Sequence, residues 1–339
     1  MDWKIHGHNW AVQLLKTHAS GGNLRHAYLF IGPQGVGRRT LALRFAQALT
    51  CLAPPEPGQF CTACVHCRQM WAMQHPDLSL LIPEEGHKDV LIDQIRELQH
   101  SLALAPYSAA YRIALLLDFQ RATTQAMNAL LKTLEEPQDK VVLLLTADSL
   151  ESLLPTIVSR CEVIRLRPAS IESTIQYLKF DQGVANDKAR LIAHLSGGRV
   201  GAALRFIEEP EALSRRADHV ETFFGLLPVT RHERFKYAEA LTKPYDTARI
   251  KVEEVLPHWL SFWRDVFIQA SGADIPLVNF DLESQVNFVA KTLDLKTARD
   301  LVTVHEKAMQ YLDAYANPRL LVETLMLRWP FISLPGLKN

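Results

Sequence analysis

The first half of the chain alternates short, continuously apolar runs with longer segments in which apolar residues recur every three or four positions. The apolar runs cover residues 27–31, 78–82, 112–118, 141–147 and 161–167, and the longer segments cover 38–50, 90–104 and 124–136. Continuous apolar strands separated by amphipathic helices indicate a parallel sheet that helices cover on both faces. We therefore predict an α/β domain over residues 1–168.

The strand-like runs stop at Ile171, and the second half is helical in pattern. Residues 169–209 suggest a few short helices broken at Ser196–Gly198, which is enough for a small lid-like unit. Longer helical patterns fill residues 210–339, and Pro257 is expected to kink or split one of them. The aromatic residues of that helix recur at helical spacing, which predicts a stripe packed in a core: Trp259, Phe262, Trp263 and Phe267.

Composition argues against three classes of protein: strongly basic nucleic-acid-binding proteins, membrane-spanning proteins and secreted proteins. The 339 residues include 37 acidic and 37 basic side chains, so the chain does not bind nucleic acid through its overall field. Apolar stretches fall short of the roughly 20 residues that cross a bilayer, and the N-terminal sequence lacks the apolar segment of a secretion signal. We expect a cytoplasmic protein without a membrane partner.

A glycine-rich loop, GPQGVGRRT at residues 32–40, follows the first apolar run. Gly32, Gly35 and Gly37 have the spacing of a phosphate-binding P-loop, whose consensus GxxxxGK[ST] ends in a lysine for phosphate and a hydroxyl for Mg²⁺. Arg38 and Arg39 stand at those two positions here. A guanidinium cannot coordinate a cation, and Thr40 lies about 100° further around the helix. The loop is therefore degenerate, or it is simply a turn that binds nothing.

The run at residues 112–118 ends in Asp118, where a Walker B aspartate would hold Mg²⁺. The next position, which carries a catalytic glutamate in many ATPases, is Phe119, and a phenyl ring cannot accept a proton. The phosphate lysine, the magnesium hydroxyl and the catalytic base are thus all missing or compromised. Their combined loss favours a retained fold without hydrolysis, and we expect ATP and ADP to be absent from this site.

Four of the five cysteines lie in one short window, at Cys51, Cys61, Cys64 and Cys67. Four thiolates at this spacing can close a tetrahedron around Zn²⁺, and a site with four protein ligands is structural. Free thiols or a disulfide are the alternatives. His66 could replace one ligand, although we expect it at the surface. The predicted zinc module covers about residues 51–67.

Several motifs together carry a resemblance to a known family. They are HAYLFIGPQGVG at residues 26–37, the four cysteines, HPDLSLL from His75, NALLKTLEEP at 128–137 and LLPTIVSRC at 153–161. The chain resembles the clamp-loader subunits of bacterial DNA polymerase III, within the AAA+ superfamily. These motifs cover about the first 210 residues, whereas the remainder is similar only in length and pattern.

The resemblance implies an AAA+ fold with a helical lid and a C-terminal helical collar that joins subunits into a pentamer. It also implies gamma/tau-type ATPase subunits and delta as partners, and a sliding clamp and primed DNA as targets, within the DNA-directed DNA polymerase holoenzyme of the bacterial replisome. In this family the Ser-Arg-Cys motif, here Ser159, Arg160 and Cys161, supplies an arginine finger to a neighbouring subunit. An ordinary internal salt bridge of Arg160 is the alternative.

Further departures from active relatives concern nucleotide contacts. Gly201 stands where those relatives carry an arginine that senses nucleotide, and Thr146 could fill a water-sensing position. The roles of Lys132, Glu135 and Glu136 do not follow from the sequence. The preferred hypothesis is a non-hydrolysing clamp-loader subunit without activity of its own. The alternatives are an active ATPase motor subunit in which Arg38 binds phosphate, and a zinc-containing DNA-binding protein on a decayed ATPase frame.

Overall fold

The structure is a computed structural model that describes residues 3–21, 23–84 and 87–333 of the chain. It divides into two compact units. One unit comprises Met1–Gln182 and Gly198–Ala202, and the other comprises Gly183–Gly197 and Ala203–Asn339.

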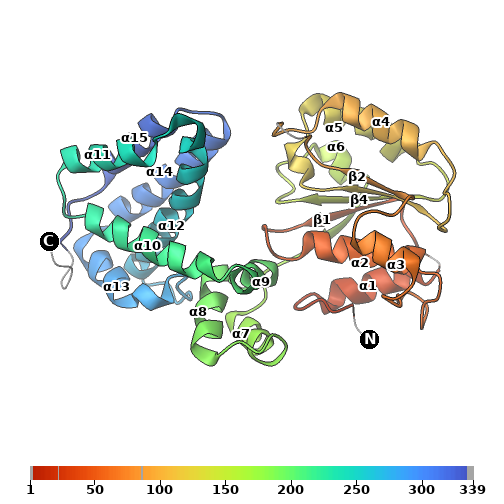
Figure 1. The fold of residues 1–339 in the computed structure, drawn as a ribbon, viewed down its shortest axis with the longest axis horizontal. Helices are drawn as coiled ribbons and strands as arrows, with labels where there is room; N and C mark the ends of the chain where they lie inside the picture. Colours follow the sequence, from red (N-terminus) through yellow and green to blue (C-terminus); the bar gives the residue numbers. More distant parts are fainter. Residues whose placement is uncertain (1–2, 22, 85–86, 334–339) are drawn as a thin grey trace. The chain divides into compact units, whose positions relative to one another are not determined.

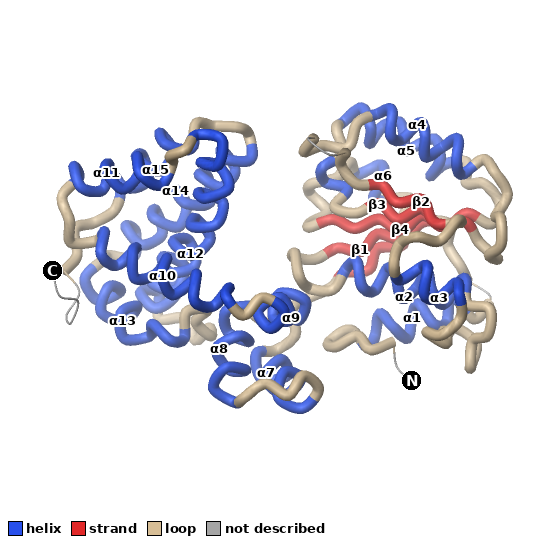
Figure 2. Tube along the Cα trace, viewed as in Figure 1, coloured by secondary structure: helices blue, strands red, loops and turns tan. Residues whose placement is uncertain are grey.

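A five-stranded parallel sheet forms the centre of the first unit (Figures 1 and 2). Its strands lie in the order β2-β3-β4-β1-β5, and every neighbouring pair is parallel. This confirms the predicted parallel sheet. The strands are β1 (Ala27–Ile31), β2 (Leu78–Leu81), β3 (Arg112–Leu116), β4 (Val141–Ala147) and β5 (Glu162–Arg165).

Helices cover both faces of this sheet, as Figure 1 shows. The strands are apolar on both sides: Leu29 contributes to the core on one face, whereas Tyr28 and Phe30 contribute to the core on the other. This double burial explains the continuous apolar runs in the sequence. One face carries α1 (Asn9–Ala19), α2 (Arg38–Thr50) and α3 (Val65–Trp71), and the other carries α4 (Ile92–Leu102), the 3-10 turn η1 (Phe119–Arg121), α5 (Thr124–Glu135) and α6 (Pro155–Val158).

Three short helices follow the sheet, namely α7 (Ile171–Phe180), α8 (Asn186–Ser196) and α9 (Val200–Glu208). The expected break after Ser196 is confirmed, because Gly197 and Gly198 both adopt left-handed backbone angles. Helix α7 belongs to the first compact unit and α8 to the second. A lid at residues 169–209, with flanking domains at 1–168 and 210–339, stays a prediction.

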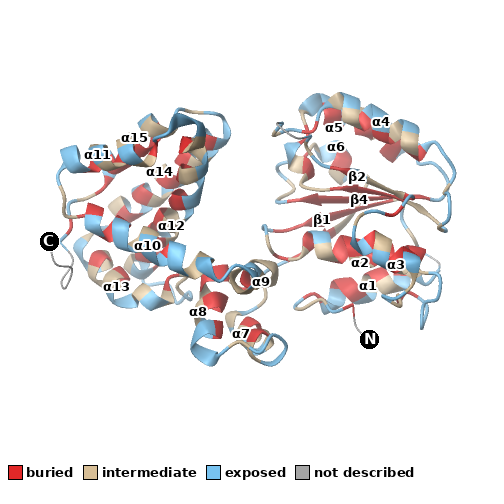
Figure 3. Cartoon of the chain, viewed as in Figure 1, coloured by how far each residue is buried: buried red, intermediate tan, exposed pale blue. Residues whose placement is uncertain are grey.

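The second unit is entirely helical over its described residues (Figure 1). Helix α12 runs 27 residues through Pro257, which therefore does not split it. Trp259, Phe262 and Trp263 are buried along α12, and Phe267 packs partly buried against the same core, so the predicted core stripe is confirmed. Figure 3 shows buried stretches along the helices of this unit. Beyond α8 and α9 the unit contains α10 (Glu211–Leu226), α11 (Arg231–Leu241), α12 (Tyr245–Ser271), η2 (Phe280–Leu282), α13 (Glu283–Thr292), α14 (Leu295–Asp313) and α15 (Pro318–Arg328).

A buried arginine ties the ends of two of these helices together. The guanidinium of Arg234 donates to carbonyl oxygens at the end of α10 and at the end of α15. Helix C-termini leave carbonyl groups without intrahelical partners, and the fork of an arginine can satisfy several at once. Among the described helices, none is both long enough and apolar enough to cross a bilayer.

Candidate functional site: a degenerate phosphate loop, a cysteine cluster and a surface arginine

The glycine-rich loop lies at the carboxyl end of β1, where parallel sheets bind their ligands. Gly32 has a φ of +155°, and a Cβ atom there would lie 2.4 Å from the carbonyl oxygen of Leu166. Only glycine fits so close to the backbone that leaves β5. At the other end of the loop, Gly37 has a φ of +108° and leads directly into α2. The predicted strand-loop-helix geometry is therefore present.

Arg38 does not project into the loop as a free cation. Its side chain is only 6% exposed, and its two terminal nitrogens bind different carboxylates. Nη2 lies 2.9 Å from Oδ1 of Asp118, and Nη1 lies 2.6 Å from Oδ1 of Asp148. A planar guanidinium fork suits two such acceptors at once. Asp118, the predicted Walker B carboxylate, is thus paired with the arginine that follows the glycine-rich loop.

Asp148 was missed by the sequence analysis, although it directly follows β4 at the same edge of the sheet as Asp118. Its second carboxylate oxygen accepts a hydrogen bond from Nε2 of Gln120 at 2.9 Å. Thr146, at the end of β4, is buried, and its hydroxyl oxygen accepts the backbone N–H of Asp118 at 2.8 Å. The hydroxyl therefore holds the aspartate backbone in its left-handed conformation.

The other positions singled out in the two motifs differ in burial. Arg39 is exposed and Thr40 is half-buried. Phe119 is fully buried in the core under α5, so its ring acts in packing. The side chains at this edge thus form a closed ionic cluster of one arginine and two aspartates.

The first residues of α9 pack directly against the loop. The carbonyl oxygen of Gly35 accepts the backbone N–H of Gly201 at 2.8 Å and that of Ala202 at 3.3 Å. A Cβ atom at position 201 would lie 2.8 Å from the same carbonyl oxygen. Position 201, where active relatives are expected to carry a nucleotide-sensing arginine, therefore leaves no room for any side chain in this arrangement.

The substitution Gly201→Ala tests this close approach. Alanine is favoured over glycine in a helix by about 1 kcal/mol, but the overlap with Gly35 opposes this gain at a cost of about 1–3 kcal/mol. We expect Gly201→Ala to lower the thermal stability of the α/β unit. Gly225→Ala is the matched control, since a Cβ at this helical glycine meets nothing within 4 Å and should raise stability. Equal stabilisation by both variants would contradict the packing described here.

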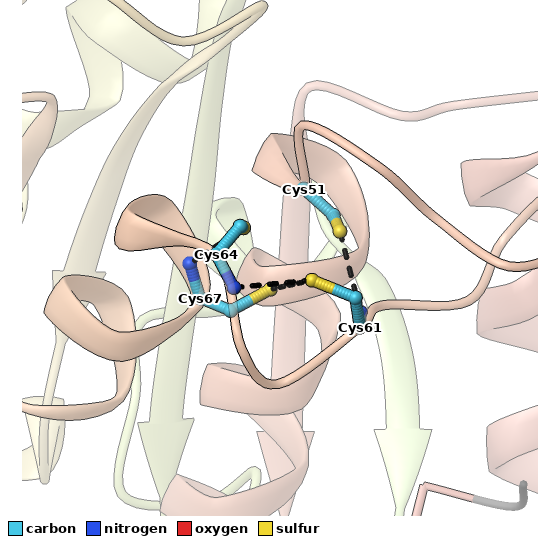
Figure 4. A group of neighbouring side chains, drawn as sticks. All are labelled: Cys51, Cys61, Cys64 and Cys67. Carbon is cyan, nitrogen blue, oxygen red and sulfur yellow. Dashed lines mark hydrogen bonds between the residues drawn. The ribbon is translucent and has the colours of Figure 1, made fainter.

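The four clustered cysteines come together as predicted (Figure 4). Their sulfur atoms all lie within 4.8 Å of one another. Cys51 follows the last residue of α2, Cys61 lies in the loop after it, and Cys64 and Cys67 lie at the start of α3. A tetrahedral ion with Zn–S bonds of about 2.3 Å requires sulfurs about 3.8 Å apart, so small adjustments would close the site.

Three backbone N–H groups donate hydrogen bonds to sulfur atoms of this cluster. Sγ of Cys51, Cys61 and Cys64 accepts the N–H of Cys61, Cys64 and Cys67, respectively, at 3.2–3.4 Å. The N–H of Cys64 lowers the pKa of Cys61 to about 6, whereas burial raises the pKa of Cys51 and of Cys67. N–H donors that stabilise thiolates are typical of metal-binding cysteine clusters. The four residues can therefore hold a metal ion.

The expectation that His66 lies at the surface is wrong. The ring is buried, its Nδ1 lies 2.9 Å from the carbonyl oxygen of Thr50, and it packs edge-on against His75. Helix α3 is further attached to α2 by Nε2 of Gln47, which donates to the carbonyl oxygen of Cys67 at 2.7 Å. The cysteine module is thus anchored to the helix that begins at the phosphate loop.

The Ser-Arg-Cys motif lies between α6 and β5. Ser159 is exposed, whereas Cys161 packs against the core beneath α5, where burial raises its pKa to about 12 and keeps the thiol neutral. The Arg160 side chain is 35% exposed, and its Nη2 lies 2.7 Å from Oε1 of Glu135. The internal salt bridge of Arg160 therefore exists, but at the surface.

Strand direction separates Arg160 from the chain's own phosphate loop. Arg160 precedes β5, and the register of β1 with β5 places Gly32 beyond Ile31, which pairs with Arg165. Arg160 lies in the turn before Glu162, and the four strand steps from Glu162 to Leu166, at the level of Gly32, span about 13 Å at about 3.3 Å per residue. The arginine and the loop thus lie at opposite ends of two neighbouring parallel strands.

Comparisons with known proteins find similarity to subunits of DNA polymerase III. A profile of the family described as DNA polymerase III, delta subunit, matches residues 7–170. DNA polymerase III subunit delta' of Pseudomonas aeruginosa is 41% identical over 152 residues, which is 45% of this chain and 46% of that relative. The Haemophilus influenzae subunit delta' is 35% identical over 62% of this chain and 66% of the relative. The Bacillus subtilis subunit delta' is 27% identical over 93% of this chain and 94% of the relative.

Proposed function

The chain belongs to the delta-prime family of DNA polymerase III subunits, and we propose on this basis that it is a non-hydrolysing clamp-loader subunit. In this proposal it helps an ATP-driven complex to open a sliding clamp and place it on primed DNA. Its chemical contribution is made through Arg160, in the ATP site of a neighbouring subunit. The chain covers about half of the length of the first relative and about two thirds of the second. The activity is therefore proposed from the residues of the candidate site, and not from similarity to these relatives alone.

The two ion pairs of Arg38 are the main support for the proposal that the chain does not hydrolyse ATP. In a working site the loop's cation meets the β- and γ-phosphates, and the Walker B aspartate holds Mg²⁺. Here the two groups neutralise each other, and Asp148 occupies the second half of the guanidinium fork. ATP and Mg²⁺ would have to break both pairs before binding. The buried Phe119 then offers no base for water.

The position of Arg160 supports a role in trans. It precedes β5, whereas the chain's own loop follows the end of β1, so the full length of β5, about 13 Å, separates the arginine from that site. Its partly exposed position at the end of α6 suits contact with another subunit. A guanidinium that reaches across an interface can stabilise charge on a transferring phosphoryl group.

The cysteine cluster is proposed as a structural Zn²⁺ site, because four thiolates leave no open position for substrate. Zn²⁺ would fix the turn between α2 and α3, and with it the far end of the helix that starts at the loop. The proposed partners are gamma/tau-type ATPase subunits and delta, joined in a pentamer through the helical residues 210–339. The balance of 37 acidic and 37 basic residues agrees with contact to DNA through the whole complex. The proposed location of that complex is the cytoplasm.

Nucleotide turnover by the isolated chain tests this assignment. With ATP and Mg²⁺ we expect no hydrolysis above the background rate, and no difference between the wild type and Asp118→Ala. Magnesium-dependent turnover that disappears in Asp118→Ala would instead show an active ATPase subunit. Tight binding of DNA by the isolated chain, falling steeply with salt, would favour a DNA-binding protein on an ATPase frame.

A further inference from the structure

Arg160 is held by three acceptors of its own chain. Nη2 pairs with Oε1 of Glu135 at 2.7 Å, and Nη1 lies 2.9 Å from the carbonyl oxygen of Thr156 and 3.4 Å from Oγ of Ser159. Contacts at both terminal nitrogens fix the plane of the guanidinium, which a single contact would leave free to turn. Because an arginine has five N–H donors, the group keeps donors for a further ligand.

Glu135 occupies a position that its own helix does not favour. It is the last residue of α5, and Glu136 follows as the C-cap. A helix C-terminus carries partial negative charge, so carboxylates there destabilise the helix. The guanidinium of Arg160 offsets that repulsion at Glu135. The pairing with Arg160 therefore accounts for a glutamate that helix stability alone would disfavour.

We propose that Glu135 is a positioning residue for Arg160. It holds the guanidinium in the orientation in which it meets phosphate oxygens in the neighbouring subunit. This inference rests on the proposed arginine finger and adds to it a role for the glutamate of the NALLKTLEEP motif. An oriented guanidinium loses less freedom when it engages the reacting phosphate, so the benefit appears in the chemical step.

The test uses the clamp-loader complex reconstituted with variants of this chain, with ATP hydrolysis measured over a range of ATP concentrations. We expect Glu135→Ala to lower kcat at the site that Arg160 serves by about fivefold, the scale of one exposed ion pair, with KM unchanged. Glu135→Gln keeps an acceptor oxygen without the charge, and it should recover part of the loss. Glu136→Ala is the matched control, since Glu136 is exposed and adjacent, and we expect it to match the wild type.

A double variant separates positioning from general damage to the fold. If Glu135 acts through Arg160, then Glu135→Ala should change nothing further in a chain that already carries Arg160→Ala. A further drop in kcat in the double variant would show that the glutamate acts by another route, and it would overturn the inference.

The same assay distinguishes the two hypotheses. If Arg160→Ala slows hydrolysis while Glu135→Ala equals the wild type or exceeds it, the finger stands and the positioning role fails. If Arg160→Ala has no effect, the proposed finger fails, and the role of Glu135 fails with it. A fall in kcat for both variants, with a normal rate for Glu136→Ala, supports the inference.

Discussion

Arg160→Ala should reduce ATP hydrolysis at the interfacial site of the reconstituted complex by at least about 100-fold, since arginine fingers contribute about 10³–10⁵ in rate. The isolated variant should remain folded, because the side chain is partly exposed and its loss removes one surface ion pair worth about 1 kcal/mol or less, together with two exposed hydrogen bonds to Thr156 and Ser159. Single-turnover hydrolysis, together with the rate of clamp loading, measures the effect. Other ATP sites in the complex would keep their own rates.

Two further variants make this result specific. Arg160→Lys keeps the charge but lacks the planar fork, so it should recover only part of the rate. Arg68→Ala removes an exposed arginine of α3 in the same unit, and it should match the wild type. An unchanged rate in Arg160→Ala would remove this residue from the reaction and leave its pair with Glu135 as a structural contact.

Loss of one cysteine ligand should have the largest effect on stability. We expect Cys64→Ser to abolish stoichiometric zinc and to destabilise the α/β unit by about 4 kcal/mol or more, because the binding free energy of a structural metal is also folding free energy. Metal analysis of freshly reduced protein and chemical denaturation measure the two effects. The loss of structure should be largest in the cysteine module, because the segment between Cys51 and Cys61 contains no helix or strand that would hold it without the metal.

Cys161→Ala is the control for this experiment, because Cys161 lies outside the cluster. Its zinc content should equal that of the wild type, although removal of a half-buried thiol can lower stability modestly. Wild-type stability of Cys64→Ser, or an absence of zinc from the wild type, would contradict a structural zinc site.

Much of the fold could be predicted because it depends on local patterns. Residues 27–31 and 141–147 are continuously apolar, which parallel strands require when helices cover both faces. The cysteine cluster could also be predicted, because its four ligands are close in sequence and a short loop brings them together. The order of the strands could not, since it depends on crossovers between distant segments.

In the candidate site, too, the residues in local motifs could be predicted, whereas contacts between distant segments could not. Arg38, Asp118 and Arg160 were identified by their motifs. The ion pairs that they form, with one another or with further carboxylates, were not predicted. Asp148 lies 110 residues from Arg38 in the chain, and no local pattern distinguishes it from other aspartates that follow strands. The lack of space at Gly201 likewise depends on a backbone carbonyl of a distant loop.

The sequence by itself determined which elements form, which glycines allow the loop and which four cysteines can bind a metal, because these properties reside in short segments. The tertiary structure alone decided that Arg38 is neutralised by two aspartates and that Arg160 pairs with Glu135 near the other end of the strands. Ion pairs depend on distances of a few ångströms between side chains, and only the packed sheet and its helices set those distances.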